Sequence, residues 1–207
     1  MITINNQLLQ LPIEEVEEEI AKLIGLGYTH LILTFPALID GEYEIEDMVT
    51  KFNMFKLNFK GINLHLGSEL NYHYSIIHRL KKRDVLTLDQ SEYILLRLPK
   101  EEKPEQFKQL IMALSSYRII LSCVEDYKYF SIDELEEMKD MGILYLSNIK
   151  NIGKKKVKKL LKRKLIDYLC FYDDIDAFDE KLKNRFGNAY INQITKDNFC
   201  KILKIDL

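Results

Sequence analysis

Short runs of branched and aromatic apolar residues recur along the chain, separated by longer stretches with helical periodicity. Runs of this length are typical of buried strands, although periodicity alone does not distinguish them from pieces of buried helix. Seven runs have this character: Ile2–Ile4, His30–Thr34, Ile62–Leu66, Tyr93–Leu98, Ile119–Ser122, Leu144–Leu146 and Tyr168–Phe171. Their length and spacing favour seven strands.

The stretches between these runs place apolar residues on one helical face and charged residues on the other. In the first, Ile13–Ile24 supplies an apolar face opposite a series of glutamates. Pro12 suits its first turn, and Gly25 or Gly27 ends it. Further helices are predicted at 45–59, 74–82, 104–115, 132–141, 154–164, 176–186 and 196–203.

A strand–helix alternation predicts parallel strands joined by right-handed crossovers. Seven units along the chain leave roughly 30 residues for each, the size of a βαβ repeat. Two α/β arrangements remain open, a small barrel of about seven strands and an open doubly wound sheet. No glycine-rich phosphate loop follows the first strand, which weakens the nucleotide-binding form of the open sheet. No linker interrupts the pattern, so we predict one domain over residues 1–207.

Composition narrows the class of protein. The 207 residues are 47% hydrophobic and 30% charged, as in a soluble globular protein, and the net charge of −2 attracts neither nucleic acid nor an anionic membrane. The sequence has no signal-peptide pattern at Met1–Asn6 and no apolar run long enough to span a bilayer. Cys123, Cys170 and Cys200 form no CxxC pair, which favours a reducing compartment. We therefore expect a cytoplasmic protein without membrane insertion.

In either α/β arrangement the functional site lies at the carboxyl ends of the strands. A multinuclear hydrolase needs imidazoles and carboxylates there, to bind metal ions and activate water. The residues that follow the seven runs include several acids but no histidine. We expect His30, His65, His73 and His78 to be imidazoles at the surface or at the edge of the core.

Five segments at the predicted strand ends nevertheless follow the order and spacing of a family's motifs. They are Ile2–Gln7, Thr34–Pro36, Gly67–Leu70, Cys123–Tyr127 and Phe171–Asp174, at places where that family has HxH, Thr-x-His, Gly-x-Glu, His-x-Glu-Arg-Tyr and Ser-Asp-x-His. Outside the site, segments 80–88, 138–148 and 159–165 also match. The chain thus resembles the bacterial capsular-polysaccharide tyrosine phosphatases of the polymerase and histidinol phosphatase (PHP) superfamily. The resemblance implies a PHP-like distorted (β/α)7 barrel, and the family uses manganese or other divalent metals.

Most ligand positions implied by this resemblance carry other residues. Only Glu69 keeps the family's residue, while Asn5, Gln7 and Pro36 replace histidines. Amides bind borderline metals poorly, and proline has no side-chain donor. We therefore expect no catalytic residue and no cofactor, but a vestigial pocket of Asn5, Gln7, Pro36, Glu69, Cys123, Glu125, Asn148, Tyr172, Asp173 and Asp174, in which either Tyr172 or Asp173 takes the family's aspartate place.

These substitutions predict a catalytically degenerate phosphatase that binds a protein partner. The resemblance implies a tyrosine kinase or an exopolysaccharide-assembly protein as that partner. A competing hypothesis is an active phosphatase or other phosphoesterase, whose carboxylates Glu69, Glu125, Asp173 and Asp174 bind Mg²⁺ or Mn²⁺.

A third hypothesis concerns the segment Lys150–Lys164, whose lysines could neutralise nucleic-acid phosphates. Against it, Val157, Leu160 and Leu161 form an apolar face, so the lysines are the solvent side of a barrel helix. We do not expect nucleic-acid binding. Arg97 is the one cation expected near the site, where it holds an anion or pairs with Glu101 or Glu102.

Overall fold

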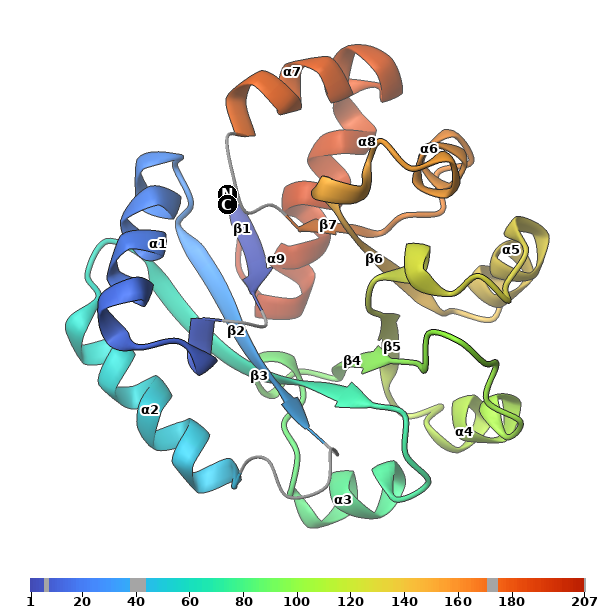
Figure 1. Ribbon diagram of the computed structural model, residues 1–207, viewed down its shortest axis with the longest axis horizontal. Helices are drawn as coiled ribbons and strands as arrows, with labels where there is room; N and C mark the ends of the chain where they lie inside the picture. Colours follow the sequence, from blue (N-terminus) through green and yellow to red (C-terminus); the bar gives the residue numbers. More distant parts are fainter. Residues whose placement is uncertain (6–7, 38–43, 171–174, 207) are drawn as a thin grey trace.

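Seven parallel strands form the centre of the protein in a computed structural model that describes residues 1–5, 8–37, 44–170 and 175–206, without the side chains of 175–179. The strands are β1 (Ile2–Asn5), β2 (His30–Ala37), β3 (Asn63–Asn71), β4 (Tyr93–Arg97), β5 (Arg118–Leu121), β6 (Leu144–Asn148) and β7 (Tyr168–Cys170). Each strand is hydrogen-bonded to the next in sequence order, and β7 lies against β1. The sheet therefore curls into a nearly closed barrel (Figure 1).

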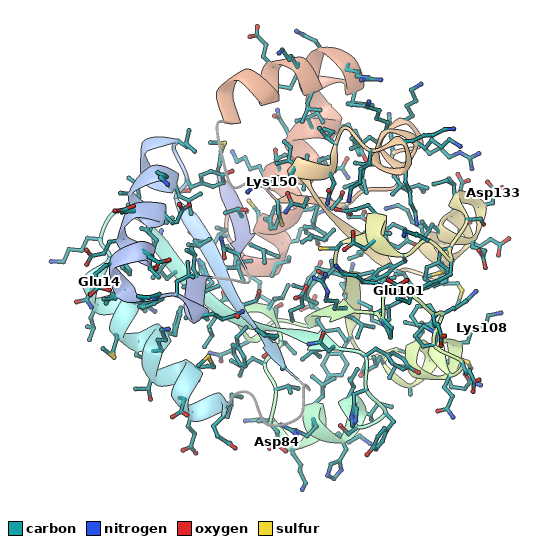
Figure 2. The ribbon with its side chains drawn as sticks, viewed as in Figure 1. Glu14, Asp84, Glu101, Lys108, Asp133 and Lys150 are labelled. Carbon is teal, nitrogen blue, oxygen red and sulfur yellow. The ribbon has the colours of Figure 1, made fainter. Side chains whose placement is uncertain are left out.

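Helices surround this barrel and connect consecutive strands (Figure 1). The connecting helices are α1 (Ile13–Gly25), α2 (Ile45–Asn58), α3 (Ile76–Lys82), α4 (Phe107–Ala113), α5 (Ile132–Asp140) and α6 (Lys155–Lys162), and α7 (Ile175–Phe186), α8 (Asn188–Asn192) and α9 (Asn198–Leu203) follow β7. Short turns η1 (Leu8–Gln10), η2 (Leu88–Gln90), η3 (Val124–Asp126) and η4 (Ile149–Asn151) lie at the barrel ends, and η5 (Gln193–Asp197) joins α8 to α9. Charged side chains such as Glu14, Lys108 and Asp133 project from the outer helices (Figure 2).

The predicted α/β barrel is confirmed, and the sequential strand order excludes the doubly wound alternative, because a doubly wound sheet reverses its strand order at a switch point. The helix predicted at 196–203 begins only at Asn198, after a π-helical turn, and α8 was not predicted. The lysine-rich helix α6 buries Val157, Leu160 and Leu161 as expected. Helix α5 starts at a capping box in which Ser131 and Glu134 exchange hydrogen bonds.

Two apolar cores hold the barrel together. The larger lies between the strands and the outer helices. The smaller fills the barrel interior with alternate strand residues, and η2 and α9 complete it at the amino ends of the strands. Its buried members are Ile2, Ile4, Ile32, Leu88, Tyr93, Leu95, Ile120, Leu146, Tyr168, Cys170, Phe199, Ile202 and Leu203. We call this set the inner core. The polar side chains at the carboxyl ends therefore stand on an apolar floor.

No helix in the described part of the chain is long and apolar enough to cross a membrane. The three cysteines, Cys123, Cys170 and Cys200, are all free thiols.

Candidate functional site at the barrel mouth

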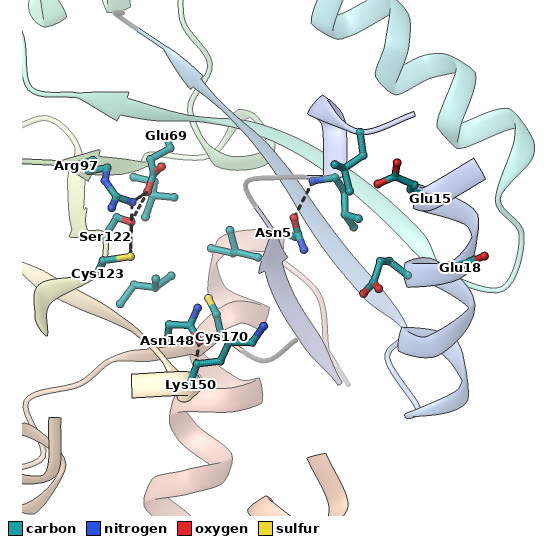
Figure 3. A pocket seen from close by; sticks show the side chains of 16 residues that line it. Asn5, Glu15, Glu18, Glu69, Arg97, Ser122, Cys123, Asn148, Lys150 and Cys170 are labelled. Atoms are coloured by element: carbon teal, nitrogen blue, oxygen red, sulfur yellow. Dashed lines mark hydrogen bonds and ion pairs between the residues drawn. The ribbon is translucent and has the colours of Figure 1, made fainter. Parts of the chain in front are cut away.

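The carboxyl ends of the strands surround a pocket of about 570 Å³, which we call the mouth (Figure 3). Its polar lining includes Asn5, Glu69, Arg97, Ser122, Cys123, Asn148 and Lys150 from the strand ends, and Glu15, Glu18 and Glu19 from α1. Ile4, Leu95, Leu146 and Cys170 of the inner core form its floor. The mouth thus has the position that the sequence predicts for the site.

A hydrogen-bonded cluster around Glu69 occupies one side of the mouth (Figure 3). The Glu69 side chain is only 5% exposed, and its Oε1 accepts a short hydrogen bond from Ser122 Oγ. Arg97 Nη1 lies 3.4 Å from the same oxygen and 3.7 Å from Cys123 Sγ. A permanent positive charge therefore faces the carboxylate that the resemblance assigns to metal binding.

The Arg97 guanidinium also reaches Asp126, with 3.6 Å between Nη2 and Oδ2. Although burial opposes its charge, Glu69, Cys123 and Asp126 together keep the pKa of Arg97 above its usual value. The predicted pairing of Arg97 with Glu101 or Glu102 is wrong. Arg97 ends β4 facing the barrel interior, where the carboxylates of β3 and η3 attract it.

Cys123 follows β5 in a left-handed backbone conformation, with φ of 51°. A cysteine seldom adopts this conformation, and such backbone strain is concentrated at functional sites. Burial raises the pKa of the Cys123 thiol, and Arg97 only partly opposes this shift. The side chain is therefore a thiol near neutral pH and neither a strong nucleophile nor a strong metal ligand.

Several other predicted site residues have structural roles at the strand ends. Asn5 Oδ1 accepts a hydrogen bond from Leu8 N at 2.9 Å and so joins the end of β1 to η1. Glu125 Oε1 accepts from Asn148 N at 3.1 Å and from Asn151 Nδ2 at 2.7 Å. Glu125 Oε2 is buried and has no hydrogen-bond partner among the described residues. Glu125 therefore binds the η4 turn beneath the mouth instead of lining it.

The predicted set divides into three groups. Asn5, Glu69, Cys123 and Asn148 line the mouth. Pro36 and Glu125 do not line the mouth. Pro36 is the β2 residue in register with Glu69, and Glu125 lies in η3. Gln7, Tyr172, Asp173 and Asp174 lie outside the described residues.

Sequence reasoning missed three kinds of mouth residue: Ser122 and Cys170 on the strand ends, Lys150 in η4, and the acids of α1. The alternation of side chains along a strand could have identified Ser122. It lies two residues beyond Ile120 of the inner core and therefore points to the same side of the sheet. No comparable signal identified Glu15 and Glu18, which the sequence pattern assigns to the solvent face of α1.

The donors at the mouth fit a divalent metal poorly. Glu69 already faces the Arg97 guanidinium, Asn5 is an amide engaged in a turn, and Cys123 is protonated near neutral pH. No group of three or more His, Cys, Asp or Glu that could hold a metal is present in the described ranges. Asp173 and Asp174, which the competing hypothesis assigns to metal binding, are outside those ranges.

Solved structures resemble this protein along its whole length. A chain from the crystal structures of YwqE from Bacillus subtilis and CpsB from Streptococcus pneumoniae, described as unique metal-dependent tyrosine phosphatases, matches with a TM-score of 0.82 at 18% identity. The match covers 100% of this chain and 96% of that one. The inactive dihydroorotase-like domain of the Chaetomium thermophilum CAD-like multifunctional protein matches with a TM-score of 0.63 at 11% identity, covering 100% of this chain and 79% of that one.

The first of these structures corrects one expectation. We expected no cofactor, but the similar phosphatases are metal-dependent, so a divalent metal is a feature of the family. The expectation was wrong because it was inferred only from the substituted ligand positions.

A match to a family model assigns the chain to a protein family, whereas the structural similarity shows only the fold. No curated protein sequence is significantly similar to the chain. The model for capsular polysaccharide synthesis proteins of the CpsB/CapC type, however, matches residues 41–204, which is most of the sequence. The protein therefore belongs to the CpsB/CapC family of capsular polysaccharide synthesis proteins.

Proposed function

We propose that this protein is a catalytically degenerate member of the CpsB/CapC family that acts in the cytoplasm by binding a protein partner. The observation that carries the proposal is the contact of Glu69 with Arg97 and Ser122. In a working metal phosphatase such a carboxylate binds a metal that activates water and neutralises the transferred phosphoryl group. Here an arginine supplies the positive charge, and an arginine cannot activate water.

The charges around the mouth also oppose phosphotyrosine turnover. Glu15, Glu18 and Glu19 line the pocket from α1, and Glu19 is the one that pairs with Lys22, at 2.7 Å. A phosphoryl group carries nearly two negative charges at neutral pH, so these carboxylates repel it. Glu125 and Asp126 add little to this acidity, because Glu125 is buried outside the lining and Asp126 contacts Arg97 and Lys100.

The arrangement of charges around the mouth is suited to binding the surface of a folded protein. Acids of α1 lie on one side of the mouth, and Arg97 and Lys150 lie on the other (Figure 3). Complementary charges steer association and select partners. The family's role in capsule synthesis favours a partner in exopolysaccharide assembly, such as a tyrosine kinase.

Turnover is the first test. The purified protein is incubated with Mn²⁺ and a phosphotyrosine peptide, and phosphate release is compared with that of the Glu69→Gln variant. We expect both proteins to release phosphate at the background rate, because the carboxylate is already engaged. Mn²⁺-dependent release that falls at least tenfold in Glu69→Gln would refute the proposal.

Partner binding is the second test, and α1 offers a matched pair of variants. Glu15→Lys/Glu18→Lys reverses charges that line the mouth, whereas Glu14→Lys/Glu17→Lys reverses exposed charges outside the lining on the same helix. With the cytoplasmic domain of a capsule-synthesis tyrosine kinase as probe, we expect the first variant alone to change affinity. Equal effects of both variants, or no binding by the unaltered protein, would contradict the role of the mouth.

A second candidate function, metal-dependent phosphoester hydrolysis, draws support from Glu125. Its buried Oε2 has no hydrogen-bond partner among the described residues, and a buried carboxylate oxygen of this kind is suited to a cation. The turnover assay separates this candidate from the first, and a Glu125→Gln variant assigns the activity. Loss of Mn²⁺-dependent turnover in Glu125→Gln would favour the hydrolase.

A further inference from the structure

A second cavity, of about 1270 Å³, lies at the opposite end of the barrel from the mouth. It lies where β3 and β4 separate, because these strands pair only through Glu69–Asn71 and Leu95–Arg97. Nearer the amino end of β3, the segment that precedes β4 lies beside β3 in place of a paired strand. Leu86 N of this segment donates a hydrogen bond to Ser68 Oγ of β3 at 3.0 Å. The cavity is bounded by this segment, the amino ends of β2 and β3, and the last turns of α2. We call it the amino-end cavity.

A chain of hydrogen bonds crosses the wall of this cavity. Asp89 Oδ2 lies 3.0 Å from His65 Nδ1, and His65 Nε2 lies 3.0 Å from His30 Nδ1. In the tautomer that satisfies both contacts, His65 donates its Nδ1 proton to the carboxylate and its Nε2 accepts the Nδ1 proton of His30. His30 Nε2 is then left as the basic atom at the end of the chain.

The backbone next to this chain is strained. Asp89 and Gln90 are consecutive residues with φ of 49° and 57°. Two successive left-handed residues other than glycine are unusual, and surrounding structure must hold them. The packing of η2 against β3 and the bond to His65 hold Asp89 at the cavity.

Positive charges dominate the described lining of the amino-end cavity. Lys56, Lys60 and Arg83 line it, together with the two imidazoles, and Asp89 is the one carboxylate among the described lining residues. A hydrogen bond from His65 leaves the Asp89 carboxylate its negative charge, so the three cations and this one anion give the described lining a net positive charge. Phe52, Phe59, Ile62, Leu64 and Val85 add an apolar wall.

We propose that the amino-end cavity binds a small phosphate monoester with an apolar or aromatic body, and that His30 takes up a proton when the ligand binds. The phosphoryl group faces Lys56, Lys60 and Arg83, and the body of the ligand packs on the phenylalanines. On protonation, His30 Nε2 becomes a hydrogen-bond donor, while the chain to Asp89 spreads the added charge. This proposal is independent of the function assigned to the mouth.

The surrounding charges determine the direction of the pH dependence. Burial lowers the pKa of His30, as do the neighbouring His65 and the amino group of Met1, while Asp89 opposes the shift. These groups together favour the neutral form of the His30 imidazole in the free protein. A bound dianion favours the protonated ring, so affinity rises as pH falls. The groups that act on His30 are His65, the Met1 amine and Asp89, and the other charged or titratable groups of the cavity lining are Lys56, Lys60, Arg83 and Tyr117.

Calorimetric titration with phenyl phosphate and with inorganic phosphate, at pH 6 and pH 8, tests the proposal. We expect phenyl phosphate to bind more tightly than inorganic phosphate, and more tightly at pH 6. The double variant Lys56→Gln/Lys60→Gln should weaken binding about tenfold, since two exposed ion pairs with the phosphoryl group are lost. His30→Gln should weaken it about tenfold or more and remove most of the proton uptake measured in buffers of different ionisation enthalpy.

Lys150→Gln at the mouth and Lys108→Gln on α4 are the controls, because neither lines the amino-end cavity. Both should bind phenyl phosphate as the unaltered protein does. Binding that depends on Lys150 but not on Lys56 and Lys60 would assign the ligand to the mouth and overturn the proposal. No measurable binding of either probe would overturn it, and so would Zn²⁺ binding through His30 and His65 without phosphate binding.

Discussion

Replacement of Arg97 by methionine tests whether the Glu69 cluster is held by charge. Methionine keeps much of the volume but leaves a carboxylate that is 5% exposed without its guanidinium. Removal of one partner from a fully buried pair costs about 3–5 kcal/mol. The cost should be smaller here, about 2 kcal/mol, because Arg97 is 23% exposed, the contact is 3.4 Å, and Ser122 still donates to Glu69.

Urea unfolding of Arg97→Met, Glu69→Gln and the double variant measures this coupling. If the charges interact, the double variant loses about 1–2 kcal/mol less stability than the sum of the single variants. Arg118→Met is the control, because Arg118 is 62% exposed and 3.9 Å from Glu92, so its removal should cost less than about 1 kcal/mol. Additive losses, or equal losses for Arg97→Met and Arg118→Met, would show that charge does not hold the cluster.

Three further predictions concern Gly67, Ser131 and His30. Gly67→Ala should destabilise the protein by about 1–3 kcal/mol, measured by urea unfolding, because an added Cβ would lie 2.7 Å from Leu88 Cδ2 and 3.1 Å from Leu88 Cα. An unchanged unfolding midpoint would mean that η2 shifts freely. Ser131→Ala removes the cap of α5 and should cost about 1 kcal/mol by the same measurement, whereas a neutral result would mean that solvent replaces the cap. The pKa of His30 is lower in the folded protein than in the unfolded chain, so the unfolded chain binds more protons just below pH 6.5. The free energy of unfolding therefore decreases as the pH falls from 6.5 through the folded-state pKa of His30. Stability measured from pH 5 to 8 should therefore depend less on pH in His30→Gln, and an unchanged profile would assign the effect to another group.

The sequence pattern located the strand starts better than the strand ends. β2 and β4 begin at the predicted residues, since apolar branched side chains mark the buried stretches. β3, however, continues to Asn71 because Glu69–Asn71 pairs with β4, a contact between residues distant in sequence. Helix α8 was missed because its five residues are too few to show a helical period. Tertiary packing of Tyr190 and Ile191, rather than propensity, stabilises it.

The candidate site was predictable in position but not in its bonding. The order of motifs placed Glu69 and Cys123 at one end of the barrel, where the mouth is. Which atoms contact each other depends on side-chain direction, so the sequence left two alternatives for Arg97, an anion or its neighbours Glu101 and Glu102, and did not identify Glu69 and Asp126. Likewise, no local pattern joins His30, His65 and Asp89, because three separate segments supply them.

The inner core also constrains how the protein is made. Its members range from Ile2 in the first strand to Leu203 in the last helix, and α9 covers the interior at the amino ends of the strands. A polypeptide emerging from the ribosome therefore displays the apolar residues of β1 long before the segment that shields them has been translated. Chains stalled or cut before Asn198 should expose this surface, bind chaperones and aggregate, so that completion of synthesis and solubility are linked.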